Sequence, residues 1–148
     1  MDLQIRGADQ LGDLAKQLRA AGDSGKGLKK ELYRGLNRAT KPLRETAQKR
    51  AATDLPQEGG LAALVSKRKG STRIRTGKNP SVTITFGGTG ASTDRGFVRH
   101  RVFGRGPWVV QRVDGAGWFT NTMRAGAPTV RKELVQAIDN VADQIRKA

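Results

Sequence analysis

The chain has 148 residues, of which 36% are apolar, a size and composition that suit one domain with a modest core. Its 28 lysines and arginines outnumber 13 acidic residues, and the formal charge of +15 favours a polyanionic partner, nucleic acid first and anionic lipid second. The absence of cysteine excludes disulfides and thiolate metal sites, and no apolar run approaches the roughly 20 residues needed to span a bilayer.

The N-terminus predicts a short strand and a helix. Leu3–Arg6 alternates apolar and polar residues, as a half-buried strand does, and the first residues lack the basic start and apolar core of a signal peptide. A helix then opens at Ala8 or Asp9 and carries leucines on one face. Gly22 stands at the position where helices commonly end.

A longer helix follows, with Asp23 or Ser24 as its cap. Leucines and alanines recur along it at steps of three and four, while lysines and arginines occupy the opposite face. Pro42 removes a backbone donor and predicts a kink inside this helix. Leu55-Pro56 predicts its end.

The middle of the chain predicts strands and loops. Residues 61–65 are too few to classify by periodicity, and residues 67–70 are typical of a mobile basic turn. Strands around 72–76 and 82–86, joined by Gly77–Pro80, favour a hairpin. Residues 87–96 hold several glycines and predict a flexible loop, after which Phe97–Phe103 predicts a third strand.

The C-terminal region is predicted to be helical from Gly117-Trp118-Phe119 onward, with Pro128 in the first turn of the last helix. We therefore expect an α+β fold, in which a small antiparallel sheet packs against the long kinked helix and the C-terminal helix. We expect residues 1–148 to form a single domain, with mobile loops near 66–80 and 87–96.

Two motifs raise the question of nucleotide binding or catalysis. Gly87-Gly88-Thr89-Gly90 is glycine-rich, but no Gly-Lys-Ser/Thr and no apolar helix follow it, so a surface loop is favoured over a phosphate-binding loop. His100, the only histidine, has no nucleophile close in sequence, and the nearest acidic residues are Asp94 and Asp114. We expect no enzymatic activity, no cofactor and no metal.

A basic set occupies the middle third of the chain. Between residues 67 and 105 the only acidic residue is Asp94, so these cations repel one another without a counter-anion. Such rows can follow a phosphate backbone without reading bases, whereas the plainer alternative is a solvated face. The residues expected to face a DNA channel or another polyanion are Lys67, Arg68, Lys69, Arg73, Arg75, Lys78, Arg99 and Arg101.

The segment Gly96–Trp108 sets aromatic residues among arginines and predicts a protein interface. Trp and Arg are enriched at interface hot spots. Trp108, next to Gly106-Pro107 in an expected turn, is favoured as an interface residue, and Phe119 is favoured as a core residue. The expected subunit or inter-ring contacts are His100, Phe103, Arg105, Trp108, Gln111 and Trp118.

Three segments together resemble the neck and tail-completion (head–tail connector) proteins of long-tailed bacteriophages. They are Leu3–Gly7 before the helices, Ala51–Pro56 with Gly59-Gly60-Leu61, and Val98–Gly104 with Gly117-Trp118-Phe119. The resemblance covers nearly the whole chain. Many family members have an acidic residue before the Phe-Gly, where this chain has Arg101-Val102, and Asp-Thr-Gly after the helix proline, where this chain has Gln57-Glu58-Gly59. These departures leave neck protein, tail terminator and minor capsid component open.

The resemblance implies a structural virion protein, assembled in the host cytoplasm, that joins head to tail and lines the DNA channel. It implies that the chain forms a cyclic ring with further copies of itself, for which a hexamer or dodecamer is expected. The other implied partners are the adjacent adaptor or stopper proteins, the tail-tube or terminator proteins, and double-stranded DNA, which is bound without sequence preference. No membrane is implied. The alternative is a free, sequence-nonspecific DNA-binding or packaging protein.

Overall fold

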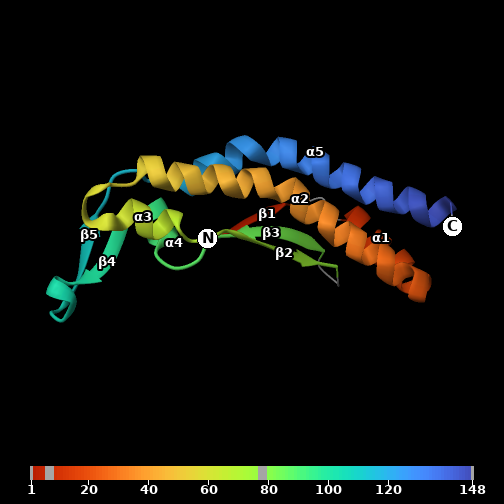
Figure 1. Cartoon of the computed structure of the whole chain (residues 1–148), viewed down its shortest axis with the longest axis horizontal. Helices are drawn as coiled ribbons and strands as arrows, with labels where there is room; N and C mark the ends of the chain where they lie inside the picture. Colours follow the sequence, from red (N-terminus) through yellow and green to blue (C-terminus); the bar gives the residue numbers. More distant parts are fainter. Residues whose placement is uncertain (1, 6–8, 77–79, 148) are drawn as a thin grey trace. The chain divides into compact units, whose positions relative to one another are not determined.

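The computed structural model describes residues 2–5, 9–76 and 80–147. The fold class is α+β, as expected, with a long N-terminal helix, a C-terminal helix and small sheets (Figure 1). In chain order the elements are β1 (Asp2–Ile5), α1 (Asp9–Ala20), α2 (Asp23–Asp54), the 3₁₀ helix η1 (Glu58–Gly60), α3 (Leu61–Ser66), β2 (Ser71–Arg75), β3 (Ser81–Thr85), α4 (Gly90–Asp94), β4 (Phe97–Arg101), the 3₁₀ helix η2 (Val102–Gly104), β5 (Trp108–Arg112) and α5 (Trp118–Lys147).

The chain divides into two compact units. The hairpin unit comprises Leu43–Ser71 and Thr85–Ala125, and the helix–sheet unit comprises Asp2–Pro42, Thr72–Ile84 and Gly126–Ala148. Both α2 and α5 contribute to each unit. Pro42 lies inside α2, which continues past it, and is the last residue of the helix–sheet unit in this helix. The kink expected there stays a prediction.

The helix–sheet unit buries the apolar faces that the periodicity predicted. The buried residues include Leu11, Leu14 and Leu18 of α1, Leu32 and Leu36 of α2, Val82 and Ile84 of β3, and Val130, Leu134, Ile138 and Val141 of α5. The sheet has the order β1-β3-β2, so β3 is its central strand. Val82 and Ile84 alternate with the half-buried Thr83 and Thr85, so one face of β3 packs against the core.

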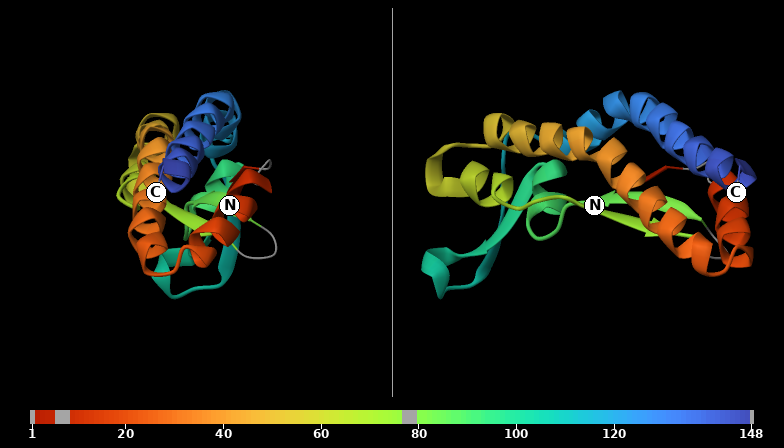
Figure 2. Two further views of the ribbon diagram at one scale, coloured as in Figure 1. Left: turned by 90° about the vertical axis from the view of Figure 1, so that its right-hand side faces the viewer. Right: turned by 45° about the vertical axis from the view of Figure 1, so that its right-hand side comes forward.

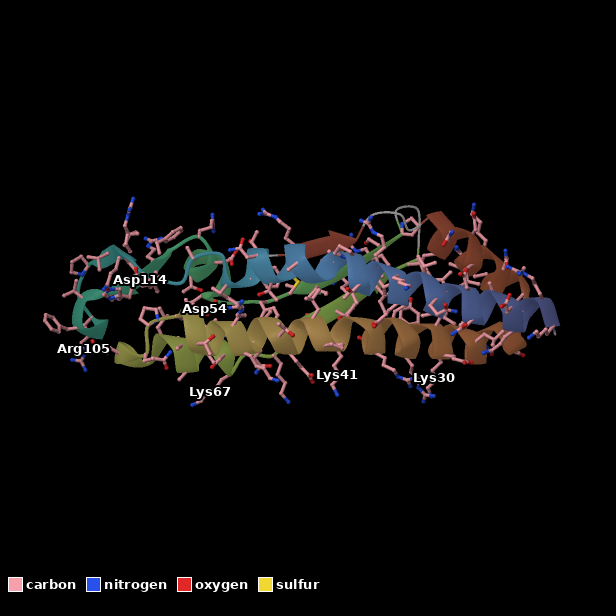
Figure 3. The ribbon with its side chains drawn as sticks, turned by 90° about the horizontal axis from the view of Figure 1, so that it is seen from above. Lys30, Lys41, Asp54, Lys67, Arg105 and Asp114 are labelled. Atoms are coloured by element: carbon pink, nitrogen blue, oxygen red, sulfur yellow. The ribbon has the colours of Figure 1, made fainter. Side chains whose placement is uncertain are left out.

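Close contacts fix the helices of this unit. Gly35 of α2 lies so near Ala137 of α5 that an added Cβ would be 3.2 Å from the Ala137 Cβ. Gln144 Nε2 donates to Glu31 Oε1 at 2.9 Å, and the two helices run side by side here (Figure 3). Gly22 adopts φ +62° between α1 and α2, which confirms its expected role at the end of the first helix.

The hairpin unit is built around three aromatic rings. Phe86, Trp118 and Phe119 meet edge to face, with centroid separations of 5.5 to 5.9 Å. The Trp118 indole N–H donates to Thr93 Oγ1 at 3.2 Å. Trp118 is only 2% exposed, so its expected position at a subunit interface is wrong, and the ring belongs to the core.

Two expectations for the strands and loops of this unit also need correction. The strand at Phe97–Arg101 does not join β2 and β3 but pairs antiparallel with β5 in a separate two-stranded sheet. Residues 87–96 are not a plain loop, because they contain α4, in which Thr93 and Asp94 are buried. Thr93 and Ser92 hydroxyls donate to the Thr89 carbonyl, which closes this short helix.

The C-terminal helical region begins at Trp118, as predicted, but it forms one helix, whereas a separate last helix was expected to begin near Pro128. It runs without a break from Trp118, so Pro128 lies in its interior and not in its first turn. Its start is set by Asp94, whose Oδ1 accepts the backbone N–H groups of Phe119 (2.7 Å) and Thr120 (3.0 Å). The carboxylate therefore caps α5 from a position 25 residues away.

Candidate functional site

The β4–β5 hairpin is the candidate functional site. Within the hairpin unit it extends away from α3 and α4, with η2 at its far end (Figure 2). The register pairs Phe97 with Arg112, Arg99 with Val110 and Arg101 with Trp108. Because residues directly opposite share a face, these six side chains lie on one face of the hairpin.

Arginine and aromatic side chains stack on that face. The guanidinium groups of Arg99 and Arg101 both lie over the Trp108 ring, with each Cζ 5.1 Å from the ring centroid. At the base of β4, Arg95 lies over the Phe97 ring with its Cζ 5.3 Å from the centroid. Such cation–π contacts contribute about 0.5 to 1 kcal/mol each at exposed positions.

The opposite face of the hairpin carries His100 and Gln111. Nε2 of His100 lies 3.1 Å from Oε1 of Gln111, and Nδ1 lies 3.1 Å from the Arg101 carbonyl oxygen. Both side chains are exposed. The pair links the two strands, and their expected assignment to an interface stays a prediction.

The turn at the tip presents Phe103 to solvent. Phe103 has φ +50° and is 99% exposed, and Gly104 follows with φ +73°. Backbone hydrogen bonds close the turn: Val102 N–H donates to the Pro107 carbonyl, and Arg105 and Gly106 N–H groups donate to the Val102 carbonyl. A phenylalanine in the left-handed region is strained by about 1 to 3 kcal/mol, and strain of this kind clusters at functional positions.

The base of the hairpin is anchored to the core. Val113 N–H donates to the Gly96 carbonyl at 3.0 Å, and Gly117 N–H donates to the Asp94 carbonyl at 2.7 Å. Gly115, at φ +88°, lies directly against the backbone of Asp54 at the end of α2, where no side chain fits. The hairpin is therefore a fixed arm and not a free loop.

A groove lies beside the base of the arm. It has a volume of about 510 Å³ and is lined by the η1–α3 segment and by the His100 face of the hairpin. Its apolar lining includes Leu61 and Leu64, and Leu64 is 51% exposed. Glu58 and Asp114 are the acidic residues in its wall. The sequence did not indicate this groove, although Leu61 and Leu64 mark an apolar side of α3.

The remaining predicted cations lie apart from the arm. Lys67, Arg68 and Lys69 follow α3 and are exposed; Lys67 points away from the ribbon in Figure 3. The Arg68 guanidinium packs over Gly88, where a side chain would overlap it. In the other unit, Arg73 and Arg75 lie on the exposed face of β2, and the half-buried Thr72 and Ile74 lie on its opposite face. Lys78 lies outside the described residues.

Sequence reasoning missed several functional-site residues. No strand was predicted at Trp108–Arg112, after the turn expected at Gly106-Pro107, although Val109-Val110 is typical of a strand. Arg95, Phe97, Val110 and Arg112 complete the Arg–aromatic face but were not assigned to it. In the part of the chain that the structure describes, no helix combines the length and apolar character needed to cross a membrane.

Comparison with known proteins gives no assignment: no protein-family model, no curated protein and no solved structure matches the chain. The function must therefore be argued from the arm, the groove and the exposed cations.

Proposed function

We propose that the chain is a structural subunit of a ring at the head–tail junction of a long-tailed bacteriophage, as its sequence resemblance implies. The observation that carries this proposal is the anchored arm whose tip holds a strained, fully exposed phenylalanine, Phe103. A solvated aromatic at a strained position gives no benefit to the isolated chain. In an assembly the phenyl group of Phe103 becomes buried against a neighbouring subunit and anchors the contact.

The exposed cations support a place around DNA. Lys67, Arg68 and Lys69 follow one another on the surface of the hairpin unit, and Arg73 and Arg75 share one face of β2 in the other unit. Cations of this kind attract a duplex without reading its bases, which suits DNA that slides through a channel. In this proposal the partners are the same chain in a cyclic ring, neighbouring adaptor and tail proteins, and double-stranded DNA in the virion.

Loss of the gene tests the role in joining heads to tails. We expect the lysate to contain DNA-filled heads beside separate tails when it is imaged by electron microscopy. Complementation with a triple variant, Lys67→Ala, Arg68→Ala and Lys69→Ala, then tests the channel. It should join heads to tails but deliver DNA poorly. Complete particles in normal number without the gene would contradict the proposal.

A second candidate is a free DNA-binding or packaging protein. The stacked Arg99–Trp108–Arg101 group favours it, because cations interleaved with aromatic rings also bind nucleic acid. Such a protein binds DNA as an isolated monomer, with an affinity that falls steeply with salt, by a slope of about 0.9 per neutralised phosphate in a double-logarithmic plot. A connector subunit binds DNA weakly alone. Titration of the monomer with duplex DNA at several salt concentrations distinguishes the two.

A further inference from the structure

We infer that the arm is the self-association device of this chain: the Phe103 tip of one copy docks in the groove beside the arm of a second copy. This inference rests on the proposed ring function and names the contact that would close the ring. Tip and groove both belong to the hairpin unit, so the contact needs only surfaces that this unit presents.

The tip carries one aromatic ring and two cations. Phe103 is 99% exposed and contacts nothing in its own chain that hides it from water. Arg101 and Arg105 are exposed on either side of it, and Arg105 points outward at the end of the arm in Figure 3. Because the turn is closed by backbone hydrogen bonds, the backbone that presents these side chains is held in place before any partner binds.

The groove has the complementary chemistry. Its volume of about 510 Å³ is within the range of pockets that bury small organic groups, and Leu61 and Leu64 supply apolar lining. Glu58 and Asp114 stand in its wall, and among the described residues neither forms an ion pair. An exposed aromatic flanked by cations therefore meets a groove whose lining holds two carboxylates against the single guanidinium of Arg112.

Charge selects a second copy of this chain as the occupant. Between residues 56 and 117 there are three acidic residues, and the third, Asp94, is buried as the cap of α5. The two carboxylates of the groove are thus the accessible negative charges of a strongly basic region. Placing the arginine-bearing tip there relieves repulsion between copies that otherwise opposes assembly.

The contact joins two different surfaces, so it is heterologous. Repetition of a heterologous contact produces a ring when the rotation closes. A single pair of copies that exchange arms through a two-fold axis is the other arrangement of the same contact. The mass of the assembly distinguishes them.

Charge exchange between separate chains tests the contact. Arg105→Glu and Glu58→Lys should each weaken self-association, measured by sedimentation velocity and light scattering. Mixing the two single variants should restore it, because each interface in an alternating assembly again pairs opposite charges. Restoration on mixing supports a contact between chains. Unchanged association of both single variants overturns the inference.

Truncation of the anchor gives the second test. Phe103→Ala should raise the dissociation constant at least about 30-fold, as expected for a central aromatic hot spot. Tyr33→Ala, which removes a half-buried aromatic side chain of α2 in the helix–sheet unit, outside both the tip and the groove, is the control and should change it less than about threefold. A photoreactive benzoyl-phenylalanine at position 103 should cross-link to residues 56–64 or 113–114 of a second copy.

The outcomes separate this inference from the proposed function. Cross-links to the groove within a ring support both. A two-fold dimer supports the docking contact and contradicts the ring. A ring that persists with Phe103→Ala, or a chain that stays monomeric at every concentration, overturns the docking contact. In those two cases electron microscopy of the gene-deletion lysate still tests the head–tail role independently.

Discussion

The two sheets that the structure describes use apolar residues in opposite ways. In β3, the central strand of the β1-β3-β2 sheet, Val82 and Ile84 are buried. In the β4–β5 hairpin, Trp108 and Val110 are exposed, and the turn adds the fully exposed Phe103. The first sheet is held by a core, whereas the second depends on stacked arginines and on its anchored base.

This difference indicates that the β4–β5 hairpin is the surface at which the chain exposes apolar side chains to a partner. An isolated two-stranded hairpin is marginally stable in water. The β4–β5 pair nevertheless holds large apolar side chains in solvent. Stability of the free chain does not account for them, and contact with another molecule does. The predictions that follow test how far the two sheets differ, beginning with the largest effect.

Removing a core side chain from the first sheet should have the largest effect. Ile84 is 0% exposed, and Ile84→Ala should lower the free energy of unfolding by about 2 to 5 kcal/mol through lost burial and a cavity. The 67% exposed Val110 gives the control on the second sheet, where Val110→Ala should change it by less than about 0.5 kcal/mol. Urea unfolding measures both changes in the free energy of unfolding, provided that the dependence of this free energy on urea concentration has the same slope in each variant. Equal losses would remove the contrast between the sheets.

Removing the Asp94 carboxylate should have the next largest effect, because it ties the base of the hairpin to α5. Asp94→Ala leaves the N–H groups of Phe119 and Thr120 without their charged acceptor, at about 2 to 3 kcal/mol. Asp94→Asn should lose less, since its amide oxygen can still accept both N–H groups, although the charge and the acceptor for the Thr120 hydroxyl are lost. Asp143→Ala, which breaks an exposed ion pair with Arg146, is the control and should cost less than about 0.5 kcal/mol.

Removing the platform beneath two arginines should loosen the hairpin alone. Trp108→Ala deletes both cation–π contacts, about 1 to 2 kcal/mol together. Amide hydrogen exchange in β4 and β5 should rise roughly tenfold while exchange in β3 stays unchanged. Trp108→Phe keeps a ring and should retain most of the protection. A parallel rise in β3 would show that the two sheets open together.

Local patterns in the sequence predicted the parts of the fold that depend on neighbouring residues. The leucine spacing of α1 and α2 and the stop after Leu55 were predicted correctly, because periodicity and proline act within a few residues. The opening of the C-terminal helical region at Gly117-Trp118-Phe119 was also predicted, but its cap, Asp94, comes from a distant segment that no local pattern marks. Trp118 was misassigned for the same reason, since its partners Phe86 and Thr93 come from distant segments.

The candidate site was predicted in composition but not in geometry. Arginines beside Trp108 indicated an interface, yet the pairing of Arg99 and Arg101 over one ring required the register of β4 with β5. Strand register depends on the turn between the strands, and here that turn has a left-handed phenylalanine that no propensity favours. The groove brings residues 56–64 to residues 98–114, a proximity that only the fold creates.

The smallest effect should have the opposite sign. Asparagine tolerates a positive φ better than phenylalanine does, and the Phe103 ring makes no buried contact to lose. Phe103→Asn should therefore stabilise the chain by about 0.5 to 1 kcal/mol through relief of backbone strain. The measurement needs a concentration at which the chain is monomeric, because self-association raises apparent stability.

The neighbouring position supplies the control for that result. Gly104 has φ +73°, and Gly104→Ala should lower the free energy of unfolding by about 1 kcal/mol, because a Cβ is unfavourable in this conformation. If Phe103→Asn stabilises the monomer while it abolishes association, residue 103 is retained for assembly at a cost to the free chain. If Phe103→Asn destabilises the monomer by more than about 1 kcal/mol, the phenyl ring of Phe103 stabilises the hairpin itself. The apolar side chains of both sheets would then serve the stability of the free chain.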